Sequence, residues 1–143
     1  MILLDIRRFR GNTAEVERMV LQTAMEDGVN VKIRMDQDPG QAGKAQVSHY
    51  ARNILLGFDF DGNPVTNNKA SRVANWSAKA KRGEILLVRG DWITTFLDEA
   101  MSFNPLAGKN STMHDDQMDA TSGAFEILTG IKGKQRRRVE IIL

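Results

Sequence analysis

The 143-residue chain contains no cysteine, which excludes disulfide bonds and zinc–thiolate sites. No apolar run approaches the roughly 20 residues that a membrane-spanning helix requires. No signal-peptide pattern opens the chain, because Asp5, Arg7 and Arg8 interrupt its apolar start. The sequence also lacks internal repeats and low-complexity linkers. These absences are compatible with a soluble protein of a reducing cytosol.

The length and composition fit one ordinary globular domain with a real hydrophobic core. The net charge is only +2, but the basic residues are grouped. The basic groups are Lys79, Lys81 and Arg82 in mid-chain, and Lys132, Lys134 and Arg136 to Arg138 in the tail. Separate basic patches with one acidic segment suit a polyanion such as nucleic acid, held by Lys and Arg with a metal near the chemistry. The alternative is that the basic groups only make the surface soluble.

Hydrophobic periodicity predicts alternating strands and helices. Strands are expected at 2–6, 29–35, 58–60 and 84–88, and helices at 13–27, 68–81, 92–103 and 116–128. The turn at 38–44 leads into a further helix that runs to about residue 55. A turn is expected at 61–64, and residues 139–143 form either an added strand or part of a disordered basic tail. The apolar run 85–88 predicts a strand buried on both faces, and both tryptophans are expected in the core. Such alternation favours an α/β layer around a mainly parallel sheet.

The segment 114–120 concentrates three carboxylates and one imidazole just before an apolar helical pattern. On a helix, Asp115 and Asp119 would share a face and repel each other. A hard divalent cation, which prefers carboxylate oxygens, would relieve that repulsion. His114 would then bind the metal or orient a water molecule. The alternative is an acidic, solvated helix start, where Asp caps free N–H groups and complements the helix dipole.

Asp36 follows a predicted strand, and ligands in open α/β sheets gather at the carboxyl ends of strands. If the loop before Asp115 brings the acidic helix start to the same edge, these carboxylates form a site for Mg²⁺ or Mn²⁺. Such a site activates water and stabilises the transition state of phosphoryl chemistry. The alternative is that Asp36, beside Gln37 and Asp38, only forms a turn.

Two basic features are candidates for DNA contacts. Residues 38–44 place glycines and Lys44 before a helix but do not match the phosphate loop of nucleotide-binding proteins, so ATP binding is not expected. A DNA phosphate at this helix start, held by Lys44, is a reasonable alternative. Lys69 and Arg72 lie three apart on a predicted helix, where they would follow a DNA backbone or form an ordinary exposed face.

Several stretches, taken in order, resemble the C-terminal nuclease domain of the large terminase subunit of tailed bacteriophages. They are 4–11, 35–44, 68–73, 88–92, 96–99 and 114–120. The resemblance covers about residues 3–128. It implies an RNase H-like mixed sheet flanked by helices, and a Mg²⁺- or Mn²⁺-dependent hydrolase that cuts concatemeric phage DNA during packaging.

The resemblance also implies roles for individual residues. The second acid of the family falls on Asp36, where many relatives carry Glu, and the C-terminal acid falls in Asp115 and Asp116. These three would be catalytic metal ligands, and Asp119 matches a later acid of the motif that is a further candidate ligand. Lys69 and Arg72 match a basic pair assigned to DNA.

The chain departs from the family at its start. From the family pattern we expect the chain to begin after the first strand and its Asp, and no ATPase motif precedes the nuclease segment. Asp5 matches a different strand of the pattern, so it is not assigned the missing role. We therefore expect a partial nuclease domain at 1–130 with a basic tail at 131–143. Loss of one carboxylate would weaken metal binding. Loss of a strand would expose a sheet edge or a gap, so we expect self-association by strand exchange or edge pairing.

The resemblance implies double-stranded DNA as a partner, in the cytoplasm of a bacterial host. The portal, the small terminase subunit and a separate ATPase segment are the other candidate partners. Two alternatives to a nuclease stay open: a prophage-derived fragment that binds DNA or self-associates without cutting, and an inert remnant.

Overall fold

A computed structural model describes residues 1–64, 69–103 and 115–130. Helices and strands alternate along the chain, which confirms the predicted α/β class. The strands are β1 (Ile2–Leu3), β2 (Lys32–Gln37), β3 (Asp59–Pro64) and β4 (Leu86–Leu87). The helices are α1 (Thr13–Asp27), α2 (Gln41–His49), α3 (Lys69–Lys81), α4 (Trp92–Ser102) and α5 (Asp116–Gly130). A π-helical turn, Tyr50–Ile54, continues α2, so the predicted helix to residue 55 is confirmed in two parts.

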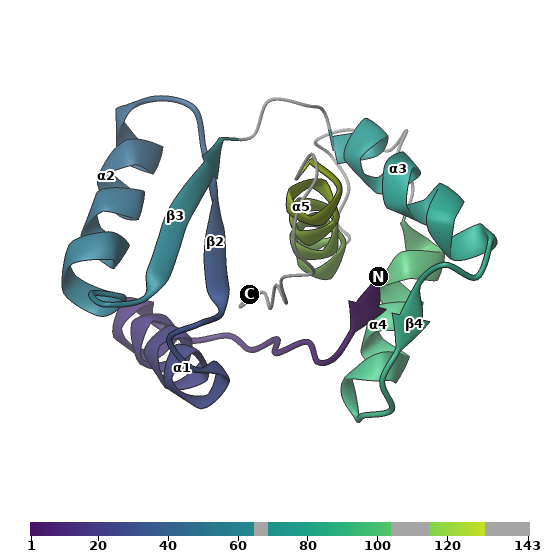
Figure 1. The fold of residues 1–143 in the computed structure, drawn as a ribbon, viewed down its shortest axis with the longest axis horizontal. Helices are drawn as coiled ribbons and strands as arrows, with labels where there is room; N and C mark the ends of the chain where they lie inside the picture. Colours follow the sequence, from purple (N-terminus) through teal and green to yellow (C-terminus); the bar gives the residue numbers. More distant parts are fainter. Residues whose placement is uncertain (65–68, 104–114, 131–143) are drawn as a thin grey trace.

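The strands form two separate parallel pairs within the described residues. In one pair β1 lies beside β4, and in the other β2 runs beside β3 from Lys32 opposite Asp59 to Gln37 opposite Pro64. In Figure 1 the β2–β3 pair lies with α1 and α2, while β1 and β4 lie with α3 and α4 on the other side of α5. The parallel pairing was predicted, but one continuous sheet was not found, because α5 faces the second edge of β2.

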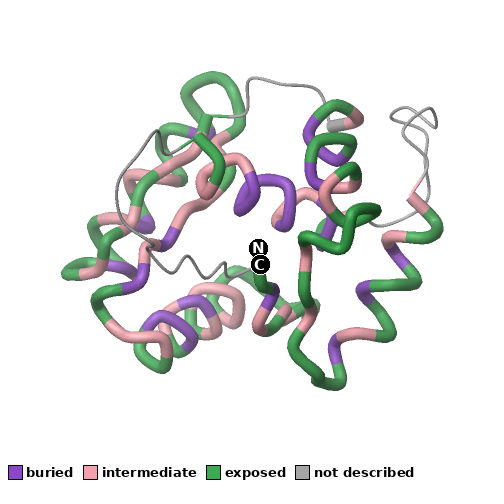
Figure 2. Tube along the Cα trace, turned by 45° about the vertical axis from the view of Figure 1, so that its right-hand side comes forward, coloured by how far each residue is buried: buried purple, intermediate pink, exposed green. Residues whose placement is uncertain are grey.

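Each strand pair has its own apolar core, and the outer turns of the helices are exposed (Figure 2). The core beside β1 includes Trp76 and Trp92, which confirms the expected position of both tryptophans. Buried Trp76 donates its indole N–H to Ser122 Oγ at 3.1 Å, which ties α3 to α5. The second core packs α1 and the π-turn against β2 through residues such as Val20, Tyr50 and Ile33. Helix α5 therefore belongs to the first core and borders the second.

The start of α1 follows its sequence signal. Asn12 Oδ1 accepts the Glu15 N–H at 3.0 Å, and the Glu15 carboxylate accepts the Asn12 N–H at 2.8 Å. This reciprocal pair satisfies two N–H groups that the first helical turn leaves free. The predicted caps before α3 lie outside the described residues. No described helix is long and apolar enough to cross a membrane.

Several strand predictions were wrong in detail. The turn expected at 61–64 instead forms the last four residues of β3, where Gly62 lies opposite Met35. Pro64 ends this edge strand, a position that proline tolerates. The strand expected at 84–88 pairs only through β4, and Leu86 is 58% exposed, so it is not buried on both faces. The strand expected at 2–6 has two residues, and that at 29–35 begins later, at Lys32.

Candidate active site

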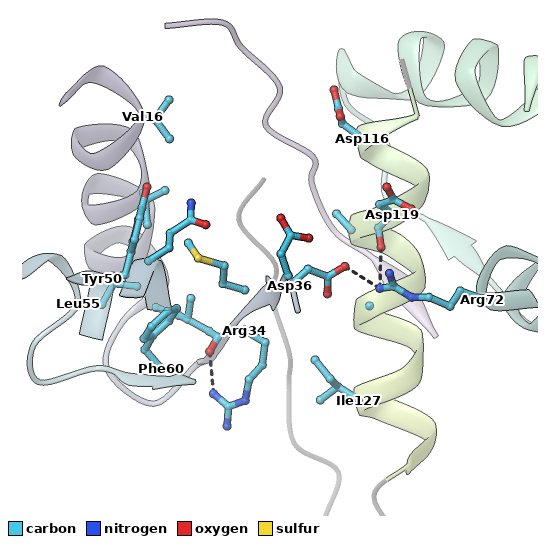
Figure 3. Close-up of a pocket in the computed structure, with 17 residues that line it drawn as sticks. Val16, Arg34, Asp36, Tyr50, Leu55, Phe60, Arg72, Asp116, Asp119 and Ile127 are labelled. Atoms are coloured by element: carbon cyan, nitrogen blue, oxygen red, sulfur yellow. Dashed lines mark hydrogen bonds and ion pairs between the residues drawn. The ribbon is translucent and has the colours of Figure 1, made fainter. Parts of the chain in front are cut away.

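One cavity, of about 480 Å³, brings together acids from two distant parts of the chain. Strand β2 contributes Asp36 near its carboxyl end, and the first turn of α5 contributes Asp116 and Asp119. Figure 3 shows the Asp36 side chain between the strand and the helix, with Asp116 and Asp119 on the helical side. The acidic helix start therefore meets the carboxyl end of the strand, as the α/β pattern predicts.

Arg72 of α3 extends past α5 toward Asp36 (Figure 3), and it is only 3% exposed. Its Nη2 donates to Asp36 Oδ2 at 2.8 Å and lies 3.5 Å from the Asp119 carbonyl oxygen. Its Nε lies 3.3 Å from the Glu126 carboxylate but lacks a hydrogen bond of good geometry. The guanidinium therefore neutralises Asp36 from inside the protein, in the position that a cation would favour.

Gly123 allows this ion pair to pack directly against α5. A Cβ atom at position 123 would lie 3.1 Å from Asp36 Oδ1 and 3.2 Å from Arg72 Nη2. Both distances are shorter than ordinary side-chain contacts, so a larger residue would push the pair away from the helix. A fourth group, Asn63 on β3, donates to Asp36 Oδ1 at 3.4 Å. The Asp36 carboxylate is thus held by Asn63 of β3 and Arg72 of α3, with the backbone of α5 close beside it.

The cavity is lined by more acidic than basic side chains. Four aspartates line it, against two arginines: Asp36, Asp38, Asp116 and Asp119, with Arg34 and Arg72. One of those arginines is partly used elsewhere, since Arg34 Nη2 lies 3.0 Å from Asp59 Oδ1. The surplus negative charge attracts cations to this end of the cavity.

The remaining predicted ligands are less well grouped. Asp115 is half-buried immediately before α5 and is not among the residues that line the cavity. His114 lies outside the described residues. Within 1–64, 69–103 and 115–130, no three His, Asp or Glu side chains are close enough together to hold one metal ion.

A buried acid that the sequence analysis did not single out, Glu99 of α4, holds the start of α5. Its carboxylate accepts the backbone N–H groups of Gln117 at 2.8 Å and Met118 at 3.0 Å, and the Gln117 side-chain amide at 2.7 Å. The signal was present, because Glu99 follows Trp92 and Phe96 at helical spacing on an apolar face. An acid on such a face requires a partner.

The three predicted DNA-binding residues differ in where the structure places their side chains. Lys44 is exposed on the first turn of α2, as a phosphate contact requires. Lys69 is the first residue of α3, and its side chain lies outside the described part. Arg72 was expected on an exposed basic face but is buried, because Asp36 and Glu126 draw its guanidinium inward. It does not present its charge to a DNA backbone.

Parallel strands flanked by helices, with one acid near a strand's carboxyl end and others at a helix start, are the organisation expected of an RNase H-like domain. The sequence model of the terminase RNase H-like domain matches residues 1–127, and the chain belongs to that family. This confirms the resemblance inferred from the motifs. Comparisons with curated proteins and with solved structures give no match.

Proposed function

We propose that this domain is a Mg²⁺- or Mn²⁺-dependent endonuclease that cuts concatemeric phage DNA during packaging. The observation that carries the proposal is the meeting of Asp36 with Asp116 and Asp119 at one cavity. Membership of the terminase RNase H-like family supports it. Hard oxygen donors at the edge of an open α/β layer suit a divalent cation better than any other cofactor.

The donor chemistry fits such an ion. Mg²⁺ keeps several waters and is commonly held by one or two carboxylates together with substrate phosphates. A pair formed by Asp36 and Asp116 is therefore sufficient, with Asp119 and Asp115 as further candidates. When bound, the ion would activate water and neutralise charge on the phosphate. The cation must compete with Arg72 for Asp36, since both are attracted to the same carboxylate.

The other residues would hold the site and the DNA. Glu99 fixes the first turn of α5, so that Asp116 and Asp119 keep their positions relative to β2. Lys44, exposed beside the helix start, would bind a backbone phosphate, and Lys69 would bind another. DNA affinity should then fall steeply with salt, because each neutralised phosphate releases counterions.

Nicking of a supercoiled plasmid by the full chain in Mn²⁺ tests the proposal. Asp36→Asn and Asp116→Asn keep the side-chain size but remove a charge from the site. Asp98→Asn is the matched control, because Asp98 is exposed on α4, away from the cavity. We expect about a hundredfold slower nicking for the first two variants and an unchanged rate for the control. Equal nicking by all four proteins, or no nicking by any, would overturn the proposal.

One observation favours a second function, DNA binding without cutting. Arg72 already pairs with Asp36, so the negative charge of that carboxylate is neutralised without a metal ion. In that case the full chain would shift DNA in a salt-dependent manner, yet it would neither nick the plasmid nor bind Mn²⁺.

A further inference from the structure

Two of the stretches that carry the family resemblance, 4–11 and 88–92, meet at a cavity that the acidic site does not use. They follow directly after β1 and β4, which are parallel neighbours. The cavity measures about 600 Å³ and is lined by residues 4–9 and 89–92 together with Met19 and Thr95. It therefore lies at the carboxyl ends of the β1–β4 pair, where open α/β layers bind ligands.

A smaller cavity of about 250 Å³ adjoins the first, since Phe9 and Met19 line both. The two cavities are lined by five arginines against three acids, which is the reverse of the balance around Asp36. The arginines come from the loop after β1, from α1 and from the loop after β4. We call the set that they form with Phe9 the arginine surface; its basic members are Arg7, Arg8, Arg10, Arg18 and Arg89.

The arginines of this surface differ in how their charge is used. Arg7 is engaged within the protein, because its Nη2 lies 2.6 Å from Glu26 Oε2 and its Nε lies 3.4 Å from Asp5 Oδ2. It therefore fastens the loop after β1 to α1. Arg18 and Arg89 are exposed, and neither forms an ion pair with any residue that the structure describes. Their charges are available to an anion such as a phosphate.

Two close contacts fix the shape of the arginine surface. A Cβ atom at position 90 would lie 2.6 Å from Trp92 Cδ1, so only glycine lets the loop after β4 lie against that buried ring. Arg89 precedes this contact and is thereby placed at the cavity. Phe9 is 37% exposed and separates the two cavities, so its ring is reached from both.

The arginine surface begins beside the acidic site. Arg8 Nη1 lies 3.9 Å from Glu99 Oε2, and the Glu99 carboxylate accepts the N–H groups of Gln117 and Met118. These two residues follow Asp116 directly in the first turn of α5. A chain bound along the arginine surface therefore lies one buried carboxylate away from the proposed cation site.

We propose that the arginine surface binds an unpaired stretch of DNA, with a base stacked on Phe9 and backbone phosphates on Arg18 and Arg89. This inference rests on the proposed nuclease function, since it places the strand beside the site that cuts it. Aromatic rings beside basic side chains are typical of single-strand binding, because every base has a face that can stack. A base inside a duplex already stacks on its neighbours, so only an unpaired base would cover Phe9.

Fluorescence anisotropy of a labelled single strand, measured with the full chain in EDTA, tests this binding. EDTA removes divalent cations, so the result does not depend on whether the chain cuts DNA. Asp36→Asn should stop nicking in Mn²⁺ and leave single-strand affinity unchanged. A chain that binds the strand as predicted but never nicks a plasmid would overturn the nuclease proposal and leave a single-strand binding surface.

Variants of Phe9 separate stacking from simple charge attraction. Phe9→Leu keeps an apolar side chain but removes the ring, and it should weaken single-strand binding about tenfold without changing duplex binding. Phe9→Tyr keeps the ring and should bind as the wild type does. Circular dichroism checks the fold of each protein. If Phe9→Leu does not fold, a fluorescent base analogue in the strand decides: stacking quenches it on binding, and an unquenched analogue would overturn the proposal.

The phosphate contacts are tested by salt dependence. Arg18→Gln combined with Arg89→Gln should reduce the slope of log affinity against log salt by about 1.4, as expected for two lost contacts to a single strand. Arg52→Gln is the matched control, because Arg52 is exposed on the π-turn and lines neither cavity. The same slope in all three proteins would overturn the proposal, and so would a Phe9→Leu effect that is equal for duplex and single strand.

Discussion

At the residue scale, Arg72 decides what the site can bind. Its guanidinium is buried and lies 2.8 Å from Asp36 Oδ2, so a positive charge is built into the carboxylate pocket. Glycine at position 123 brings this pair against α5. The sequence spacing of Lys69 and Arg72 predicted an exposed basic face. It could not reveal that acids on two other elements draw one of these two residues inward.

Removal of Arg72 should weaken the fold and strengthen cation binding. Arg72→Met leaves Asp36 and Glu126 without their counter-charge, and we expect a loss of about 2 kcal/mol in the free energy of unfolding, because both acids are partly exposed. Mn²⁺ should bind more tightly, since Asp36 is then free to ligate it. Denaturant melts and calorimetric titration measure the two effects.

Lys79→Met is the matched control, because it removes a charge from the exposed end of the same helix. The pair that it breaks, with Glu84, is exposed to solvent, so its loss should change stability much less than the loss of Arg72. A lower Mn²⁺ affinity in Arg72→Met would contradict competition and would make Arg72 a positioning residue for Asp36.

Tyr50 gives a spectroscopic test of the second core. It is the single tyrosine of the chain, so tyrosinate absorbance reports this residue alone. Burial, and secondarily the charge of Glu17, raises the pKa of the Tyr50 phenol above its ordinary value. The folded state thus favours the neutral phenol. The contribution of Tyr50 to stability is complete below its unfolded-state pKa, near 10, and is lost as the pH rises through the higher folded-state pKa.

We therefore expect the absorbance midpoint of the folded protein to lie above that of the urea-unfolded chain. Tyr50→Phe should remove both the absorbance change and its part of the alkaline loss of stability. A folded midpoint equal to the unfolded one would show that the phenol reaches water, and that the packing around Tyr50 and Leu55 is looser than described.

At the element scale, local signals predicted the helices better than the strands. Asn12 and Glu15 mark the start of α1 by a reciprocal pair that is complete within four residues. The acids at 115–119 likewise marked the start of α5. Strand extents depend on partners far along the chain. Gly62 reads locally as a turn residue, but it lies opposite Met35 in a six-residue parallel ladder.

The position of α5 depends on one buried carboxylate. Glu99→Ala would leave the Gln117 and Met118 N–H groups and the Gln117 amide without their acceptor. Hydrogen bonds to charged groups contribute about 1.5–3 kcal/mol each, so we expect a loss of about 3 kcal/mol in the free energy of unfolding. Nicking should also slow, because the acids of the first turn lose their support.

Asp98→Ala is the control for this change, since it alters the neighbouring exposed acid of the same helix and should cost less than about 0.5 kcal/mol. Chemical denaturation of the three proteins gives the comparison. Similar stabilities for Glu99→Ala and Asp98→Ala would mean that α5 is held by its apolar contacts alone.

At the scale of the whole molecule, α5 lies between two small parallel sheets and forms a wall of the cavity that carries the acids. The family, the α/β class and the meeting of the strand end with the acidic helix could all be inferred from the sequence. The division into two sheets could not, because it depends on which edge of β2 faces α5.

The central claim is that a divalent cation binds between Asp36 of β2 and the acidic first turn of α5, where Asp116 is the proposed second ligand. Paramagnetic broadening by Mn²⁺ in amide NMR spectra of the full chain tests it most directly. Substoichiometric Mn²⁺ should broaden the amides of Asp36, Asp119 and Gly123 first, excess Mg²⁺ should reverse the effect, and Asp36→Asn combined with Asp116→Asn should abolish it. Broadening that begins at surface acids such as Asp91 or Asp98, or that persists in the double variant, would contradict the account.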